Sequence, residues 1–264
     1  MASEDYSLDL IRFAERLADA AGKVARRHFR NPALTIEAKP DLSPVTQADR
    51  EVEQALRREV AASHPDHGFV GEEFAPVKPE ADYVWVVDPI DGTKAFLAGK
   101  PTFGTLIALL RHGRPLIGLI DHPVLGERWI GAAGHPTTHS GKPVHARRCS
   151  ELKAAVLCAS SPEMFEGKDR DRFERLRARV CVNGWGTDCL AYGLLASGFV
   201  DLVAEAAMGP HDYLPLVPVV EGAGGRITDW DGRPLSLESP SNGRVLAAGD
   251  PELHGKALRC LALS

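Results

Sequence analysis

The strongest candidate for chemistry is the run Asp-Pro-Ile-Asp-Gly-Thr, in which Asp88 and Asp91 stand three residues apart. Two carboxylates held this close repel each other and raise each other's pKa unless a cation or a shared proton lies between them. The ligands on offer are hard oxygens, with no His or Cys at ligand spacing, which favours Mg²⁺ over Zn²⁺. The same string is also turn chemistry, in which Asp and Gly close a loop at the end of a strand. The run therefore predicts a divalent-metal site, with a purely structural turn as the alternative.

Acidic residues elsewhere in the chain favour the metal interpretation. Glu72 follows a second short apolar run and precedes another glutamate. Asp212 follows His211 at the start of a predicted helix, upstream of a Gly-Ala-Gly-Gly stop. Asp49 stands three residues after Thr46, a spacing that also makes a capping box at a helix start. Taken alone, that pair is better explained as a cap than as catalytic machinery.

Hydrophobic spacing predicts two helices at the start of the chain. The first carries apolar residues at helical intervals with charges between them: Leu10, Ala14, Leu17, Ala21 and Val24. After a proline-rich link, the second starts near Val45-Thr46 and has the apolar stripe Val52, Leu56 and Val60.

Short β-branched and apolar runs then predict strands, with four apolar residues directly before Asp88. The strands are expected at 69–70, 83–87, 104–110, 116–120 and 127–132. Residues 111–114 indicate a hairpin turn, and residues 136–143 a surface loop.

Strands and helices alternate in the second half of the chain. Strands are expected at 155–159, 180–182, 200–204, 226–228 and 245–248. Helices are expected at 170–179, 189–196 and 212–223, and a final helix after the last strand ends at Leu261. Gly224-Gly225 is a plausible left-handed cap for the third of these helices. The predicted fold class is therefore α/β (α+β). An N-terminal α+β half, 1–150, would carry most of the metal ligands, and a C-terminal α/β half, 151–264, would supply Asp212 and substrate contacts.

Composition excludes several classes of protein. The 264 residues are 44% hydrophobic and 25% charged, which is typical of a globular protein rather than a disordered or fibrous one. The net charge of −5 and the lack of a long basic run argue against nucleic-acid binding. No stretch approaches the roughly 18 to 20 apolar residues of a membrane span, and the acidic, periodic start does not resemble a signal peptide. Five cysteines, none in a CxxC pair, argue against a disulfide framework. We expect a reduced cytoplasmic protein with no nucleic-acid or membrane partner.

In combination, these motifs resemble the inositol monophosphatase family of Mg²⁺-dependent, lithium-sensitive phosphatases. The resemblance rests on four blocks that occur in the family's order: Gly71-Glu72-Glu73, the DPIDGT run at 88–93, Asp212, and Glu221-Gly-Ala-Gly-Gly225. It covers nearly the whole chain and implies a layered α/β/α/β/α sandwich of the sugar-phosphatase type. Relatives are commonly homodimers, so the resemblance also implies a homodimer.

The resemblance further implies a role for each motif residue. Two or three Mg²⁺ ions would be held by Glu72, Asp88, the backbone carbonyl of Ile90, Asp91 and Asp212, with Asp88 bridging two of the ions. Thr93, oriented by Asp49, would help to deprotonate the attacking water. The backbone N–H groups of Gly92 and Thr93 would receive the phosphate oxygens. Hydrolysis would then need no covalent phosphoenzyme.

Within the family, the likeness is closest to histidinol-phosphatases, judged by the segments 99–110, 188–192 and 212–221. At positions where relatives touch the substrate, this chain has Asp188 and Glu205, and Asp212 also belongs to this set. Anionic groups would pair with the amine and imidazole of histidinol phosphate, whereas inositol needs only hydroxyl hydrogen bonds. Alternatively, Asp188 favours a helix dipole and Glu205 is a solvated charge at the end of a strand.

Other function classes stay open beside histidinol-phosphate hydrolysis. One is an inositol monophosphatase or broad phosphomonoesterase, and another is a catalytically idle, ligand-binding member of the fold. Two departures from the wider family, His211 in place of tryptophan and Lys94-Ala95 after the DGT run, put inositol specificity in doubt. His64 and His67 are expected at the surface, and Cys189 is expected to be a small buried residue.

Overall fold

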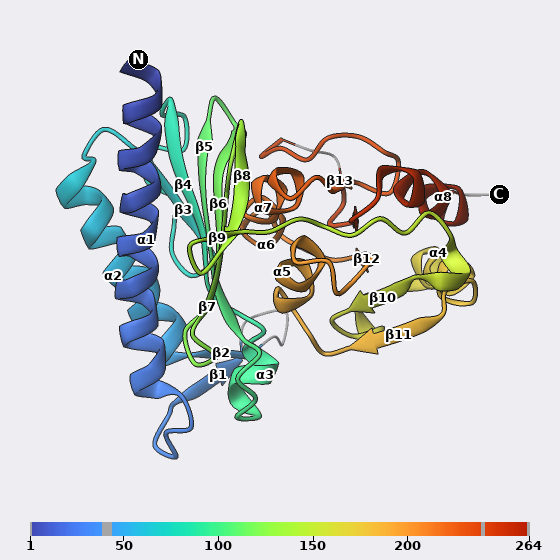
Figure 1. The fold of residues 1–264 in the computed structure, drawn as a ribbon. Coiled ribbons are helices and arrows are strands. Elements are labelled where there is room, and N and C mark those ends of the chain that lie inside the picture. Colours follow the sequence, from blue (N-terminus) through green and yellow to red (C-terminus); the bar gives the residue numbers. More distant parts are fainter. Residues whose placement is uncertain (1, 39–43, 239–240, 263–264) are drawn as a thin grey trace.

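Alternating layers of helix and sheet make up the described part of the chain, residues 2–38, 44–238 and 241–262 of the computed structural model (Figure 1). Two helices, α1 (Ala2–His28) and α2 (Gln47–Ser63), cover one face of the first sheet. Three short helices lie between the two sheets: α5 (Leu190–Ala196), α6 (Pro210–Tyr213) and α7 (Leu216–Gly222). Two more, α4 (Gly167–Arg177) and α8 (Pro251–Leu261), cover the far side of the second sheet. This arrangement confirms the expected α/β/α/β/α layering.

The first sheet has seven strands in chain order, β3 to β9. They are β3 (Gly68–Gly71), β4 (Tyr83–Asp91), β5 (Gly104–Arg111), β6 (Arg114–His122), β7 (Glu127–Ala132), β8 (His135–His139) and β9 (Lys142–Pro143). Only the β3–β4 pair is parallel. Because β3 and β4 run in the same direction, the segments that follow them emerge at the same edge of the sheet.

The second sheet has five strands in the order β11-β10-β12-β14-β13. They are β10 (Val156–Ala159), β11 (Val182–Trp185), β12 (Leu202–Glu205), β13 (Arg226–Thr228) and β14 (Val245–Ala248). A separate pair, β1 (Ile36–Ala38) and β2 (Pro44–Thr46), precedes α2, and α3 (Thr93–Leu97) follows β4. Two single 3-10 turns, η1 (Leu152–Ala154) and η2 (Pro162–Met164), flank β10.

Strand β4 is buried on both faces, which explains why its sequence is continuously apolar. Val84 and Val86 pack in the core between the two sheets, whereas Trp85 and Val87 pack against α1 and α2. By this alternation, Asp88 points to the same side as Val86, toward the layer of short helices. Burial of the strand therefore brings the first acid of the motif into the interior.

Local signals predicted several element boundaries correctly. Thr46 caps α2, accepting from the N–H groups of Ala48 and Asp49 while Asp49 accepts from the N–H of Thr46. In the β5–β6 hairpin, His112 and Gly113 both have positive φ (49° and 73°), as a tight two-residue turn requires. Gly224 has φ 87° and follows Ala223, the last half-helical residue of α7, as predicted for a left-handed cap.

Three expectations about elements were wrong. Residues 136–143 do not form a surface loop, because β8 pairs with β7 and the buried Thr137 hydroxyl donates to Val219 O at 2.7 Å. The helix expected over 212–223 is two helices, α6 and α7, which meet at Pro215, a residue with no N–H to continue the first. The strand expected at 180–182 begins only at Val182, where it pairs with Val156 of β10.

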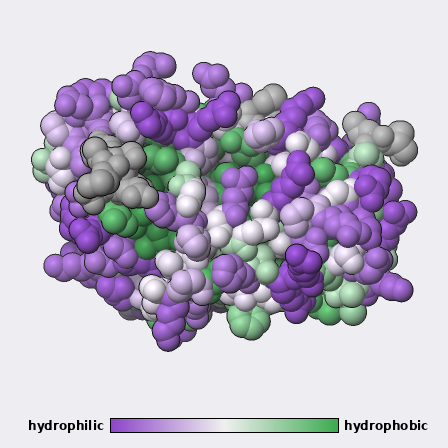
Figure 2. Space-filling model, turned by 45° about the horizontal axis from the view of Figure 1, so that its top comes forward, coloured by the Kyte–Doolittle hydropathy of each residue, from purple (hydrophilic) through white to green (hydrophobic). Residues whose placement is uncertain are grey.

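The segment 144–155 connects the two sheets, and a division of the chain near residue 150 stays a prediction. In the described ranges, no helix is both long and apolar enough to cross a membrane. Figure 2 shows a face covered mainly by hydrophilic residues, with hydrophobic ones in small patches.

Candidate active site

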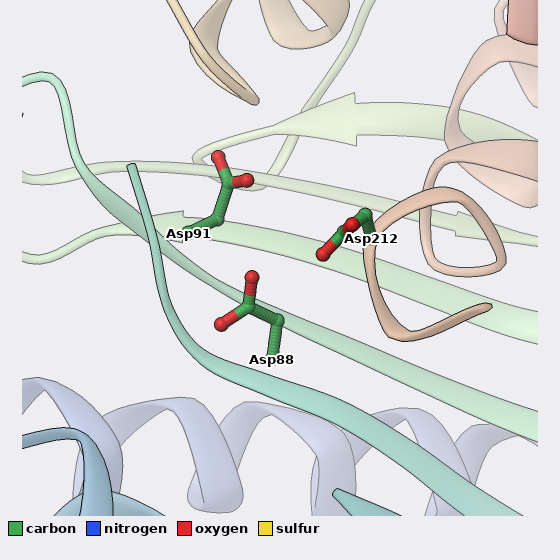
Figure 3. A group of neighbouring side chains, drawn as sticks. All are labelled: Asp88, Asp91 and Asp212. Carbon is green, nitrogen blue, oxygen red and sulfur yellow. The ribbon is translucent and has the colours of Figure 1, made fainter. Parts of the chain in front are cut away.

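Three carboxylates from two distant segments converge at the end of β4. Asp88 and Asp91 lie on either side of a break in the β4–β5 register, and Asp212 lies in α6. One oxygen from each of the three lies within 4.8 Å of the others. Figure 3 shows the side chains directed toward a shared space between β4 and α6. The structure thus brings together three of the residues predicted as metal ligands.

Each of these carboxylates is oriented by one backbone N–H group. Ile90 N donates to Asp88 Oδ1 at 2.9 Å, Cys189 N donates to Asp91 Oδ2 at 2.7 Å, and Gly209 N donates to Asp212 Oδ2 at 2.7 Å. His211 Nε2 lies 3.3 Å from Asp212 Oδ1. A neutral donor on one oxygen fixes the orientation of each acid without neutralising its charge.

The acids strongly perturb one another. The pKa of Asp88, which is 3% exposed, is raised well above its usual value by burial and then by the charges of Glu72, Asp212 and Asp91. Burial, followed by the charges of Asp188 and Asp212, raises the pKa of Asp91 in the same way. Burial also raises the pKa of Asp212. Such a cluster is unfavourable as bare anions, and a bound cation would relieve the repulsion.

Glu72 enters the site from β3. Gly71, the last residue of β3, is paired with Val87 of β4, so Glu72 leaves β3 beside Asp88, which is still part of β4. Glu72 is close enough to raise the pKa of Asp49 as well as that of Asp88. Its placement agrees with the predicted meeting of separate acidic segments.

Asp49 completes the capping box of Thr46 as the third residue of α2, and its charge also acts on Asp88. Its Oδ2 accepts from Thr46 N at 2.9 Å and from Thr46 Oγ1 at 2.5 Å. Burial, above all, raises the pKa of Asp49, with a contribution from Glu72. The capping role is confirmed, and the expected role in orienting Thr93 stays a prediction.

Thr93 and Ile90 are linked at the start of α3. The Thr93 hydroxyl donates to Ile90 O at 3.2 Å. Gly92 precedes the helix with φ 79°, and a Cβ placed there would lie 2.8 Å from Asp188 Oδ2. Glycine is thus required at this position both for the backbone conformation and for the close approach of Asp188.

A cavity of about 520 Å³ opens beside the acids. It is lined by Glu72, Gly92, Thr93, Lys94, Ala95, Lys100, Ser160, Ser161, Glu163, Met164, Gly186 and Asp188. Asp188 stands in its wall with φ 44°, and burial raises its pKa while Ser160, Lys100 and Lys94 act to lower it. Asp188 therefore combines access to the cavity with two nearby lysines.

Sequence reasoning missed several lining residues. Lys94 could have been found from its place directly after the DGT run. Lys100 lies in the segment between α3 and β5, whereas Ser160 and Glu163 follow β10 and reach the cavity only because the second sheet packs against the first.

Glu205 lies behind the cavity and not at a solvated strand end, so that alternative was wrong. It is 2% exposed, because β12 lies between β10 and β14. Its Oε1 accepts from Ser160 N at 2.9 Å and from the Ser160 hydroxyl, and its Oε2 accepts from Tyr192 OH at 2.8 Å. Burial raises the pKa of Glu205 to about 7. In this conformation, Ser160 stands between Glu205 and the cavity as a direct hydrogen-bond partner.

Other side chains singled out in the sequence have structural neighbours. Cys189 is buried, as expected, and its Sγ lies 3.8 Å from His122 Nε2. All five cysteines are free thiols. His64 and His67 are partly exposed, and their rings stack with centroids 4.6 Å apart. Trp85 Nε1 donates to His67 Nδ1 at 3.1 Å.

An acidic cluster beside a cavity in this layered fold is typical of metal-dependent phosphatases, and comparison with known proteins agrees. The model of the inositol monophosphatase family matches residues 8–262. The chain belongs to this family and is a phosphatase of it. Enzymes of the family are generally Mg²⁺-dependent, in keeping with the cluster of Asp88, Asp91 and Asp212.

Individual relatives carry different names. The chain is 48% identical to bifunctional phosphatase IMPL2 of Arabidopsis thaliana, a chloroplastic protein, over 98% of this chain and 78% of that one. It is 39% identical to the histidinol-phosphatase of Mycobacterium tuberculosis, over 91% and 94% of the two chains. Its fold matches an inositol monophosphatase from Zymomonas mobilis with a TM-score of 0.88 and 45% identity, covering 97% and 98%.

Proposed function

We propose that this phosphatase hydrolyses L-histidinol phosphate to L-histidinol and phosphate in a Mg²⁺-dependent reaction, as a step in histidine biosynthesis. The observation that carries the proposal is the acidic Asp188 in the wall of the cavity beside the carboxylate cluster. A carboxylate at that place suits a substrate whose alcohol part is cationic.

The donor set fits Mg²⁺. Glu72, Asp88, the carbonyl of Ile90, Asp91 and Asp212 would hold two or three ions, all through the hard oxygen ligands that Mg²⁺ prefers. Repulsion among the carboxylates of Asp88, Asp91 and Asp212 would be relieved by a bound divalent cation, which favours cation binding here. When bound, Mg²⁺ activates water and neutralises charge on the phosphate.

Residues of the chain supply the remaining functions. Because the Thr93 hydroxyl donates its proton to Ile90 O, its lone pairs are available to accept a hydrogen bond from the attacking water. Asp49, whose pKa is raised by burial, would assist in removing the proton. The backbone N–H groups of Gly92 and Thr93 would receive phosphate oxygens at the edge of the cavity.

Asp188 and Glu205 would have different parts in substrate choice. Asp188 lines the cavity and would pair with the amine of histidinol. Glu205 would act on the substrate through Ser160, which it holds by two hydrogen bonds. Several relatives named histidinol-phosphatase support this substrate.

Phosphate release from L-histidinol phosphate and from myo-inositol 1-phosphate, measured side by side with Mg²⁺, tests the proposal. We expect kcat/KM to favour histidinol phosphate by about a hundredfold, which corresponds to roughly 2.7 kcal/mol in transition-state binding. Comparable rates would contradict the specificity and leave a general phosphomonoesterase. No release from either substrate would favour an idle, ligand-binding member of the fold.

An inositol monophosphatase or broad phosphomonoesterase is the second candidate. It is favoured by Lys94 and Lys100, which act on Asp188 from within the cavity and would compete with a cationic substrate for it. Assembly as a homodimer also stays a prediction, which light scattering of the purified protein would test.

A further inference from the structure

Glu53 of α2 is a fully buried carboxylate outside the acidic cluster, with 0% of its surface exposed. Its charge is met by Arg57, one helical turn later, whose Nε donates to Glu53 Oε1 at 2.8 Å. The other oxygen, Oε2, accepts from Glu73 N at 2.7 Å. A helix residue therefore binds the backbone of the segment that carries Glu72.

Arg57 binds the same segment a residue further on. Its Nη2 donates to Phe74 O at 3.0 Å, and its guanidinium lies over the rings of Phe69 and Phe74, 4.6 and 5.8 Å from their centroids. Glu53 and Arg57 thus hold the peptide group before Glu73 and the peptide group after Phe74, and Arg57 also packs on Phe69 of β3.

Gly71 shows how closely the carboxylate approaches. A Cβ at this residue would lie 2.2 to 2.4 Å from Glu53 Cδ, Oε1 and Oε2, closer than any side chain could come. The glycine before Glu72 is therefore needed for the approach of Glu53, since its backbone has no positive φ that would otherwise require it.

The segment needs an anchor because of the charges around it. Glu72 faces Asp49 and Asp88, and the charge of Glu72 raises the pKa of both. Repulsion of this kind pushes the segment away from the cluster whenever no cation is present. Hydrogen bonds from a helix interior oppose that movement because α2 is itself fixed against the sheet.

We propose that Glu53 and Arg57 are positioning residues that hold Glu72 at the metal site before the ion arrives. The inference rests on the proposed function, in which Glu72 is a metal ligand. Outer groups that orient ligands typically change metal affinity by about 10- to 100-fold when they are removed. The pair belongs to the binding of Mg²⁺ and does not touch the substrate.

Isothermal titration of the full-length protein with Mg²⁺ tests this, alongside the Mg²⁺-induced rise in melting temperature. In Glu53→Ala, we expect Mg²⁺ affinity to fall about tenfold. Glu59→Gln is the matched control, because Glu59 is an exposed acid of the same helix, and it should leave the affinity unchanged.

A second variant separates loss of the positioning role from loss of folding. Glu53→Ala leaves the partly buried Arg57 without its partner, whereas Glu53→Gln combined with Arg57→Met removes both charges together. If affinity for Mg²⁺ is unchanged in the folded variants while only the melting temperature falls, the pair is merely structural and the inference is wrong. If the wild type itself binds no Mg²⁺, the proposed Mg²⁺-dependent function is wrong. That result differs from unchanged affinity in the variants, which would contradict only the positioning role.

Discussion

The N–H of Cys189 donates to Asp91 Oδ2 across 2.7 Å and joins the segment before α5 to the end of β4. Asp212 approaches the same place from α6, so both segments meet the first sheet at its acidic edge. The cluster exists only when the two halves of the chain are packed together. Activity should therefore respond to changes at this junction that leave each half folded.

Asp91→Asn tests the carboxylate cluster directly. Asparagine keeps an oxygen to accept from Cys189 N but removes one of the repelling charges. We expect turnover to be lost, with the melting temperature without metal unchanged or slightly raised, because burial and Asp188 already disfavour the charged form. Calorimetry without Mg²⁺ and a phosphate-release assay with it measure both effects. Normal turnover in this variant would contradict the assignment of Asp91 as a metal ligand.

Asp188→Asn tests substrate choice. Because asparagine tolerates the positive φ of 44° at this position, the backbone should be preserved. We expect KM for histidinol phosphate to rise about tenfold and KM for myo-inositol 1-phosphate to change little, since only the first substrate would lose a charge-assisted hydrogen bond. Equal effects on the two substrates would contradict the role of Asp188 as amine partner.

Gly92→Ala tests the contact between α3 and Asp188. The added methyl group meets Asp188 Oδ2 at 2.8 Å, in addition to the strain of φ 79°. Gly113→Ala is the matched control, because its φ is 73° and nothing lies within 4 Å of the new Cβ. Both variants should lose about 1 kcal/mol of unfolding free energy through backbone strain, and only Gly92→Ala should lose kcat/KM, by tenfold or more. Equal kcat/KM in the two variants would show that the contact is unimportant.

Signals within a few residues predicted much of this fold. Neighbouring residues were enough to predict three features that the structure contains: the capping box at Thr46, the hairpin turn at Gly113 and the buried strand before Asp88. The DPIDGT run likewise predicted an acidic cluster, and the roles of its residues as metal ligands are still proposals.

Features that depend on distant partners could not be predicted. Glu205 looks like a strand-end charge in the sequence, and its burial follows from the place of β12 between two other strands. Thr137 lies in a polar run, yet strand β8 forms there because it pairs with the neighbouring strand β7. Glu53 stands beside the apolar stripe of α2, but its partner at Glu73 N is known only from the folded chain.

His67 should make stability fall in mild acid. Burial lowers its pKa to about 4, from an ordinary value of 6.5, and Trp85 Nε1 donates to its unprotonated Nδ1. The unfolded chain therefore binds the proton first, and stability is lost as pH falls from about 6.5 toward 4. Since the ring is partly exposed, we expect a loss of about 1 kcal/mol between pH 7.5 and 5.

Urea unfolding of His67→Gln at the two pH values isolates this contribution. Glutamine can still accept from Trp85 but does not titrate, so the wild type should lose more stability than the variant on acidification. His145→Gln, at an exposed position, is the control and should follow the wild type. Parallel losses in the wild type and in His67→Gln would mean that His67 titrates normally.

Glu205 should have the opposite dependence on pH. Burial raises its pKa to about 7, against an ordinary value of 4.5, so the folded protein holds this proton more tightly than the unfolded chain. The resulting stability is complete below about pH 4.5 and is lost as pH rises through 7, when a charge must be kept inside the sheet. Glu205→Gln removes that charge, and Tyr192 OH can turn from it toward Met208 Sδ, 3.8 Å away. Relative to the wild type, this variant should therefore gain about 1 to 3 kcal/mol of unfolding free energy between pH 5 and 8. A constant difference between the two proteins over that range would show that Glu205 does not titrate there.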